Sequence, residues 1–369
     1  MAYKPVSDKS LIYTTVFLIV FGLVMVYSVL SVSTKNADSF RNQVIYACIG
    51  MTCLLSLMHV DYHFWQKPWV IMTLLAGAGA ALIVVLRMDA INGAKRWLPT
   101  GIGSATFQPS EFTKLIMLMF IAWFLHKYEK EINKGRRLLC YCAVIGIFAA
   151  LIAKEPDLGQ ALMLCAISAI LLVIAGLNWK YIAIGILCCV LVAAVCYTFN
   201  IGLKGYQAER IATVLSPSAD PQDAGWHINQ ALIAVGSGGI SGLGLGNSIQ
   251  KLSFVYAASS DFIFSIIGEE LGLLGTGVVV VAFMFFFYRG MRIAFRSQDR
   301  FGFYLGAGIT LMIILQGFTN ISVVLAILPT KGIALPFISQ GGSSLIMNLA
   351  ATGILLNMSY QNKFVGADE

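Results

Sequence analysis

Long apolar runs separated by short polar segments constrain the fold of this chain more than any other feature. A membrane-spanning helix needs roughly 20 mainly apolar residues. Ten windows approach or reach that length: about 11–31, 44–60, 69–87, 111–126, 138–153, 158–177, 181–200, 266–288, 303–327 and 344–360. The sequence therefore predicts an all-α polytopic membrane protein with about ten transmembrane helices.

The composition excludes two other classes of protein. Apolar residues make up 58% of the chain and charged residues only 12%, against about 25% charged residues in a soluble domain. No basic helix or basic-plus-aromatic motif suggests nucleic acid. We expect one transmembrane domain over residues 1–369, beginning with an uncleaved first span at 11–31.

Basic residues predict the orientation in the membrane, because cytoplasmic loops are enriched in Lys and Arg. One cluster follows the fourth window: Lys127, Lys130, Lys134, Arg136 and Arg137. Another follows the eighth: Arg289, Arg292, Arg296 and Arg300. Both clusters lie inside if both termini are cytoplasmic, which is the orientation that we predict for this multi-pass protein.

A long segment at about 201–260 is predicted to be a large extracytoplasmic loop between the seventh and eighth spans. Asp220 and Pro221 form a helix-start signal. Apolar residues then recur at helical spacing: Ile228, Ala231, Leu232 and Val235. Glycines from Gly236 onward end the pattern, so we expect a helix at the membrane surface. Long structured loops in compact proteins are usually functional.

Four outward segments are too polar for simple turns: 93–98 with 108–111, 154–159, 259–272 and 328–344. Their ionisable residues are Glu111, Glu155, Asp157, Asp261, Glu269, Glu270, Lys95, Arg96, Lys154 and Lys331. Such groups cost several kcal/mol at membrane depth unless they are paired or hydrated. A cluster on one face therefore indicates a polar cavity, where cations suit a pyrophosphate and a carboxylate can act as a general base.

Several of these residues also have a purely structural interpretation. Asp261 begins an apolar helix, where Asp is a favoured N-cap. Glu155 and Asp157 fit a tight hairpin, and Glu111 fits ordinary helix-start chemistry. Lys95 and its neighbours fit an interfacial anchor.

Glu269 and Glu270 are harder to explain in this way. Two adjacent carboxylates on an apolar helix face different directions, so at least one of them needs a partner. The histidines are scattered and no dedicated metal ligand set stands out, which leaves open whether a divalent cation (Mg²⁺ or Mn²⁺) assists the chemistry.

Five motifs in order resemble one family: GAKRW, QPSE, EPDLG, DFIF with SIIGEELG, and LPTKG with ALPFISQGGSS. Together they resemble the SEDS proteins (shape, elongation, division and sporulation), which are bacterial peptidoglycan glycosyltransferases, and the resemblance covers nearly the whole chain. The Pro-Thr-Lys-Gly form at 329–332, with Ser343 and Ser344 later, is closer to the cell-division branch than to the elongation branch.

The resemblance implies polymerisation of undecaprenyl-linked lipid II through β-1,4 linkages in an extracytoplasmic cavity. Asp261 falls on the family's catalytic aspartate and would deprotonate the acceptor 4-hydroxyl. Lys95, Arg96 and Lys331 become candidates for binding pyrophosphate. The residues expected to shape the cavity are Glu111, Glu155, Asp157, Glu270 and Ser343. The implied partners are a class B penicillin-binding protein and other division proteins.

The chain departs from the family pattern directly before Asp261. The family usually has a Pro-Glu-Ala-His-Thr-like run there, whereas residues 256–260 read Tyr-Ala-Ala-Ser-Ser. Gln340 also stands where Tyr is common. Two alternatives to the enzyme remain: a lipid II flippase and a non-catalytic division scaffold. A flippase would place its key ionisable groups near the middle of the spans, where this chain has almost none.

Overall fold

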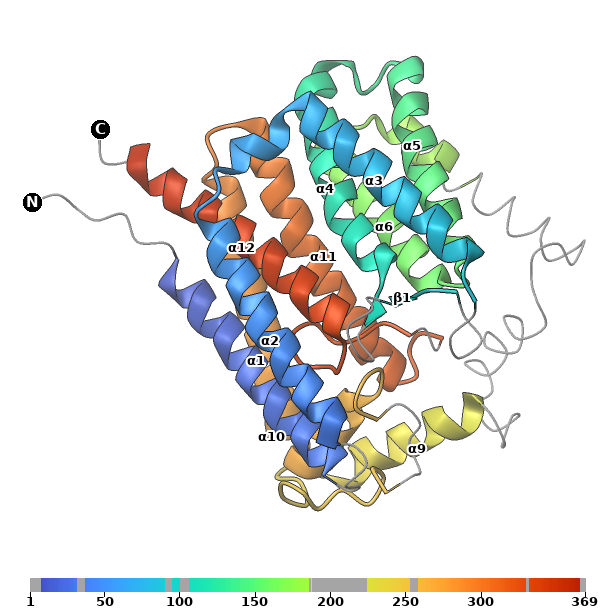
Figure 1. Cartoon of the computed structure of the whole chain (residues 1–369), viewed down its shortest axis with the longest axis vertical. Helices are drawn as coiled ribbons and strands as arrows, with labels where there is room; N and C mark the ends of the chain where they lie inside the picture. Colours follow the sequence, from blue (N-terminus) through green and yellow to red (C-terminus); the bar gives the residue numbers. More distant parts are fainter. Residues whose placement is uncertain are drawn as a thin grey trace, which may run out of the picture.

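The computed structural model describes residues 8–31, 37–89, 95–99, 106–185, 187, 224–252, 258–329 and 332–365. Within these ranges the chain is a bundle of long helices lying side by side, with one shorter helix across its lower end (Figure 1).

The helices of the bundle are α1 (Lys9–Leu30), α2 (Ala37–Met58), α3 (Pro68–Arg87), α4 (Pro109–Tyr128), α5 (Gly135–Lys154), α6 (Leu158–Ile174), α10 (Ile263–Phe295), α11 (Arg300–Val324) and α12 (Gly342–Val365). The crossing helix is α9 (Ala224–Ser237), and short 3₁₀ turns are η2 (Tyr62–Gln66) and η3 (Glu129–Glu131). Two-residue strands β1 (Leu98–Pro99) and β2 (Thr106–Phe107) pair antiparallel.

Every predicted span except 181–200 coincides with one of these helices, and most of 181–200 lies outside the described residues. Among the described residues, five helices are long and apolar enough to cross a membrane: α1, α3, α5, α10 and α11. The prediction of a helical, multi-pass membrane protein is therefore confirmed. The count of ten spans stays a prediction.

Glycines allow the closest helix contacts. A Cβ on Gly22 of α1 would lie 2.6 Å from the Cα of Ile338, and one on Gly353 of α12 would lie 2.6 Å from the carbonyl oxygen of Leu54 in α2. Small residues let backbones approach where apolar lipid supplies no drive for association. Gly353 lets α12 pack along α2, and Gly22 lets the segment before α12 pack against α1.

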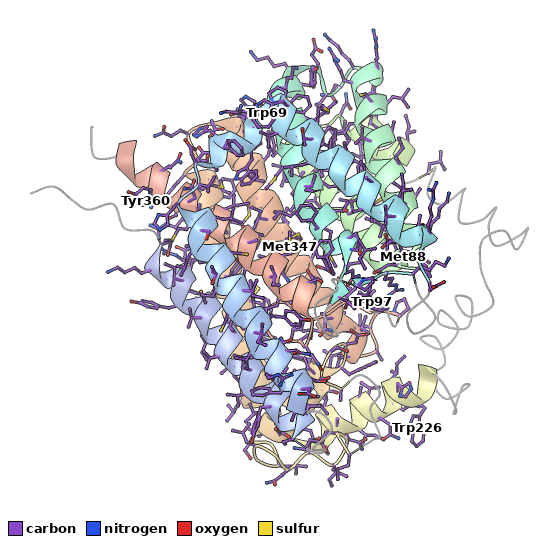
Figure 2. All side chains as sticks on the ribbon, in the orientation of Figure 1. Trp69, Met88, Trp97, Trp226, Met347 and Tyr360 are labelled. Carbon is purple, nitrogen blue, oxygen red and sulfur yellow. The ribbon has the colours of Figure 1, made fainter. Side chains whose placement is uncertain are left out.

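The two ends of the bundle differ in what they carry. α1 begins and α12 ends at the same end (Figure 1). Figure 2 places Trp69 and Tyr360 toward that end, and Trp97 and Trp226 toward the opposite one. Aromatic residues at both ends of a bundle are typical of membrane–water interfaces.

The helix predicted within the large loop is present as α9, which ends at Ser237 as the glycine pattern indicated. Its predicted cap residues, Asp220 and Pro221, lie outside the described residues, as does 201–223 generally. α9 packs against α10 and lies across the end of the bundle opposite the start of α1 (Figure 1). Trp226 in Figure 2 is a residue of α9. The predicted place of α9 at the membrane surface stays a prediction.

α10 is interrupted at Gly272, which has a φ of 62° and a ψ of −157° inside the helix. The loop 238–252 supplies the backbone partners that the break removes: Leu243 N donates to Glu269 O, Gly244 N to Glu270 O, and the N–H groups of Leu273 and Leu274 donate to Gly239 O and Ile240 O. All of these bonds are 2.9–3.1 Å long. Irregular backbone at membrane depth is tolerated only when protein or water satisfies it in this way.

Candidate functional site

Arg96 holds the turn between α5 and α6. Its Nε donates to the carbonyl oxygen of Glu155 at 3.1 Å and its Nη2 donates to that of Pro156. Its Nη1 lies 3.8 Å from Oδ2 of Asp157. A guanidinium presents several donors in a rigid fork, so one side chain contacts three consecutive residues. Arg96 is therefore more than an interfacial anchor.

Asp157 has both a structural and an electrostatic role. It is the N-cap of α6, and its Oδ1 accepts from Gln160 N at 3.3 Å, as the hairpin interpretation anticipated. Its Oδ2 faces Arg96 and also accepts from Gln108 Nε2 at 3.4 Å. Burial raises the pKa of this carboxyl, and the charge of Arg96 opposes that rise.

Glu155 is fully buried at the C-cap of α5. Neither of its carboxyl oxygens has a hydrogen-bond partner among the described residues. Burial raises its pKa to about 8, the negative charge of Asp157 adds to the rise, and Arg96 opposes it. Glu155 is therefore mostly protonated at neutral pH, and the turn carries less negative charge than its sequence implies.

Asp261 stands just before α10 and is not its N-cap, because that position belongs to Phe262. The backbone around Asp261 is fastened to the C-terminal part of the chain. Ser339 Oγ donates to the carbonyl oxygen of Ser260 at 2.5 Å, and Asn320 Nδ2 donates to that of Asp261 at 2.8 Å. The N-cap interpretation of Asp261 is thus wrong.

The carboxylate of Asp261 and the guanidinium of Arg96 converge on Gly332. A Cβ built on Gly332 would lie 3.3 Å from Oδ2 of Asp261 and 3.9 Å from Nη1 of Arg96. Residues from three of the four predicted polar segments therefore meet at one place, although 165 positions separate Arg96 from Asp261 in the numbering. This meeting point is the candidate site.

The segment 332–341, between α11 and α12, forms one wall of the site. It has no regular structure, yet Ile333, Leu335 and Ile338 are at most 1% exposed. The sequence had indicated a polar outward loop. The segment is buried because side chains satisfy its backbone: Asn320 donates to Ile333 O, Gln316 to Ala334 O and Gln43 to Ser339 O, while Gln43 also accepts from Gly341 N.

The same segment also bonds directly to the residues before Asp261. Gln340 N donates to the carbonyl oxygen of Ser259 at 2.8 Å, and Ser259 Oγ donates to Gln340 Oε1 at 2.6 Å. Gln340, which departs from the family pattern, thus pairs with Ser259, which also lies in the departing run. The two departures are in contact.

Ser343 joins the start of α12 to the chain before α4. Its Oγ accepts from Gln108 N at 3.0 Å and donates to Thr106 O at 3.4 Å. Gln108 in turn bonds to Asp157. Ser343 is therefore linked through one residue, Gln108, to Asp157 beside Arg96. Its predicted place beside a cavity stays a prediction.

Glu111 forms a buried ion pair that helix-start chemistry does not explain. Its Oε2 lies 2.9 Å from Lys114 Nζ, and its Oε1 accepts from Gln160 Nε2 at 2.8 Å. The Glu111 and Lys114 side chains are 4% and 3% exposed. Because Gln160 belongs to α6, the pair connects α4 to the helix that Asp157 caps.

Glu270 lies in a different cluster from the one around Asp261. Its carboxylate lies 2.8 Å from Lys251 Nζ, and it accepts from Ser28 Oγ of α1 at 2.7 and 2.8 Å. The neighbouring Glu269 accepts from Ser248 Oγ and from the N–H of Ile249 at 2.9 Å. Both carboxylates therefore have partners, and they anchor the loop 238–252 to the break in α10.

The other two candidates for binding pyrophosphate are Lys95 and Lys331. Lys95 is exposed, and its Nζ donates to Leu86 O at 3.4 Å, at the end of α3. Lys331 lies outside the described residues. Within the described ranges there is no group of three or more His, Cys, Asp or Glu side chains that could hold a metal ion.

Sequence reasoning missed several residues of the site, and some of them had a signal. Lys114 is a charge inside an apolar run, three residues after Glu111, which is the spacing of a helical pair. Gln316 and Asn320 are polar residues four apart in an apolar helix, so they share a face. Lys251, which pairs with Glu270 in the other cluster, had no signal, because a cation in a glycine-rich loop is ordinarily solvated.

A bundle of apolar helices with its buried charges concentrated near one end defines a multi-pass membrane protein with a polar site at that end. A family model described as "Cell cycle protein" (FtsW, RodA and SpoVE) matches residues 9–364. The chain belongs to this family, which confirms the predicted SEDS resemblance.

Two curated relatives illustrate the similarity. The chain is 38% identical over 361 residues to "Probable peptidoglycan glycosyltransferase FtsW" of Geobacter sp. (strain M18), covering 95% of this chain and 96% of the relative. It is 35% identical over 379 residues to "Stage V sporulation protein E" of Bacillus subtilis (strain 168), covering 98% and 99%. The name of the Geobacter relative agrees with the predicted enzyme class.

Solved structures share the fold. One, described as "Structural coordination of polymerization and crosslinking by a peptidoglycan synthase complex", superposes with a TM-score of 0.82 at 24% identity, covering 96% of this chain and 98% of that chain. The rod shape determining protein RodA of Thermus thermophilus superposes with a TM-score of 0.70 at 22% identity, covering 96% of each chain.

Proposed function

We propose that this chain is a peptidoglycan glycosyltransferase that polymerises lipid II, with Asp261 as the general base. The observation that carries the proposal is the convergence of the Asp261 carboxylate and the Arg96 guanidinium on Gly332. Acceptor activation needs a carboxylate and departure of a pyrophosphate needs a cation, so the two groups are the ones that the reaction requires at one place.

In this mechanism Asp261 accepts the proton of the acceptor's 4-hydroxyl as that oxygen attacks the anomeric carbon of the donor. The bond from that carbon to the lipid pyrophosphate breaks, and the pyrophosphate leaves with the electron pair. A general base acts from hydrogen-bond distance. Cations placed where negative charge develops stabilise the transition state.

Arg96 is the described cation best placed for the pyrophosphate, because its Nη1 lies on the Asp261 side of the α5–α6 turn. Lys331, next to Gly332 in the sequence, and Lys95 are further candidates that rest on the family resemblance. We assign Glu111, Asp157 and Ser343 to holding the walls of the cavity.

We place the chain in the cell-division branch, acting with a class B penicillin-binding protein in the inner membrane and with both termini in the cytoplasm. The 329–332 form of the sequence and the name of the Geobacter relative favour this branch. The description of the similar complex, which joins polymerization to crosslinking, supports a crosslinking partner.

The test is polymerisation of labelled lipid II by the purified chain with its transpeptidase partner. We expect Asp261→Asn to abolish glycan polymer while the protein remains folded by size-exclusion chromatography and thermal melting. Asp38→Asn is a matched control, because Asp38 is exposed and pairs only with the exposed Arg41 among the described residues. It is expected to keep full activity.

Undiminished polymer from Asp261→Asn would refute the proposed base. If neither the wild type nor Asp261→Asn makes polymer while both scramble labelled lipid II across vesicle membranes, the chain is a lipid II transporter. A scaffold is the outcome if neither activity is present and the chain still recruits its transpeptidase partner.

A further inference from the structure

Asn320 is a buried amide in the apolar helix α11, and it is 2% exposed. Its Nδ2 donates to the carbonyl oxygens of Asp261 and Ile333, both at 2.8 Å. Buried polar groups are normally hydrogen-bonded, and here one NH₂ group uses both of its donors on two backbone segments that are far apart in the sequence.

The surroundings determine which way the amide faces. Both neighbours are carbonyl oxygens, which only accept hydrogen bonds, so only the NH₂ end of the amide can face them. Within the described residues Oδ1 of Asn320 has no hydrogen-bond partner. The side chain therefore joins α11 both to the residues before α10 and to the segment before α12.

This contact constrains the direction of the Asp261 side chain. Ser339 holds the carbonyl oxygen of Ser260 and Asn320 holds that of Asp261. Each peptide unit is planar, so fixing two consecutive carbonyls fixes the two planes that meet at the Cα of Asp261. The direction of its Cβ follows from those planes.

The second bond of Asn320 positions what the carboxylate faces. Ile333, whose carbonyl oxygen accepts from Asn320, follows directly after Gly332 in the chain. A Cβ on Gly332 would lie 3.3 Å from Oδ2 of Asp261. One side chain thus sets both the backbone of the proposed base and the wall opposite its carboxylate.

We propose that Asn320 is a positioning residue for Asp261, acting through the backbone and not touching the substrate. The inference rests on the proposed function, since it assumes that Asp261 is the base. A displacement of about 1 Å in a reacting group can cost on the order of 100-fold in rate. Loss of the two bonds should therefore act on turnover more than on substrate binding.

A purely structural role would give a different result, and Asn357 allows the comparison. Asn357 is also a buried amide, on α12, and is 3% exposed. Its Nδ2 donates to Met58 O at 2.8 Å and its Oδ1 accepts from Tyr62 N at 3.0 Å. These contacts lie at the opposite end of the bundle from Asp261.

The experiment measures kcat, KM and melting temperature of the full chain with its transpeptidase partner and labelled lipid II. Asn320→Leu is expected to lower kcat about 10- to 100-fold with KM changed by no more than about threefold. Asn357→Leu is expected to lower the melting temperature about as much as Asn320→Leu does, and to keep at least about half of the wild-type kcat.

Asn320→Asp separates shape from hydrogen bonding, because it has the same outline but, when ionised, no donor. We expect it to lose kcat like Asn320→Leu. If Asn320→Leu does not fold, Asn320→Ser replaces it, because its shorter side chain cannot reach both carbonyls and should show the same loss of kcat.

Wild-type turnover in a folded Asn320 variant would overturn the inference, as would an equal loss of kcat in Asn357→Leu at the same melting temperature. Asp261→Asn is assayed in parallel. If it polymerises normally, the proposed function fails whatever Asn320 does. If it is inactive while Asn320→Leu is fully active, only the positioning role fails.

Discussion

Oδ2 of Asp261 faces the bare Cα of Gly332, where a Cβ would lie only 3.3 Å away. The same Cβ would lie 3.9 Å from Nη1 of Arg96. The φ of Gly332 is outside the left-handed region, so conformational freedom is not the reason for a glycine here. The absence of a side chain keeps the space beside the carboxylate open.

Gly332→Ala should therefore lower the polymerisation rate about tenfold, because the new methyl group displaces the carboxylate by a fraction of an ångström. The melting temperature should change little. Gly341→Ala is the matched control in the same segment, since its Cβ would meet only Ser344 Cβ at 3.9 Å. Equal rates for the two variants would contradict the crowding argument.

The Glu111–Lys114 ion pair should be strongly coupled, because both side chains are buried. Removing one partner from a buried pair typically costs about 3–5 kcal/mol, whereas replacing both with apolar residues is often neutral. We expect Lys114→Met to lower the melting temperature markedly and Glu111→Leu combined with Lys114→Met to recover most of the loss. Additive losses in this double-mutant cycle would show that the two residues act independently.

Glu155 should make stability depend on pH. Its pKa is raised to about 8 in the folded chain from an ordinary value of 4.5. Between these values the unfolded chain loses the proton and the folded chain keeps it, so the carboxyl increasingly destabilises the fold as pH rises through this window. The effect is absent below pH 4.5 and complete above pH 8.

Replacing Glu155 by Gln removes this titration. The melting temperature of Glu155→Gln minus that of the wild type should rise from pH 5 to pH 8 and then level off. Thermal melts of both proteins at matched ionic strength measure the difference. A difference that is flat across this range would mean that Glu155 keeps an ordinary pKa in the folded chain.

Lys251 should control opening of the loop 238–252, because it bonds to Glu270, to Ser28 Oγ at 3.2 Å and to Gly246 O at 2.7 Å. Lys251→Met leaves the buried Glu270 without its cation. We expect hydrogen–deuterium exchange in 238–252 to rise at least about tenfold, which corresponds to a loss of about 1.4 kcal/mol in local stability.

Lys180→Met is the control for that experiment. Lys180 is exposed, and its described hydrogen bond is made by its backbone N–H, which donates to Asn178 Oδ1. This variant should leave exchange in 238–252 unchanged. Unchanged exchange in Lys251→Met itself would mean that the backbone bonds to the break in α10 are sufficient to hold the loop.

The helices could be predicted because each depends mainly on its own residues. The window at 69–87 agrees with α3 at Pro68–Arg87, and the spacing after Ile228 agrees with α9. A run of apolar residues must form a helix in lipid to satisfy its backbone. The start of α2 was harder to predict, because its first turns contain the polar stretch from Asp38 to Gln43.

The candidate site was only partly predictable. Arg96 and Asp261 came from motifs in polar segments, but Glu270 was grouped with them and instead lies with Lys251 and Ser28. Its assignment to the cavity came from the family resemblance and from its place in an outward polar segment. The direction in which a side chain leaves a helix selects its partners, and the break at Gly272 changes what lies beside Glu270.

The sequence by itself determined the class of this protein: apolar runs of membrane length, with polar motifs between them that carry the family's pattern. Only the tertiary structure decided that Arg96 and Asp261 converge on Gly332 and that Asn320 holds the backbone there. A helix forms from hydrogen bonds within a few residues. The site forms from contacts between segments far apart in the chain, which exist only once the helices have packed.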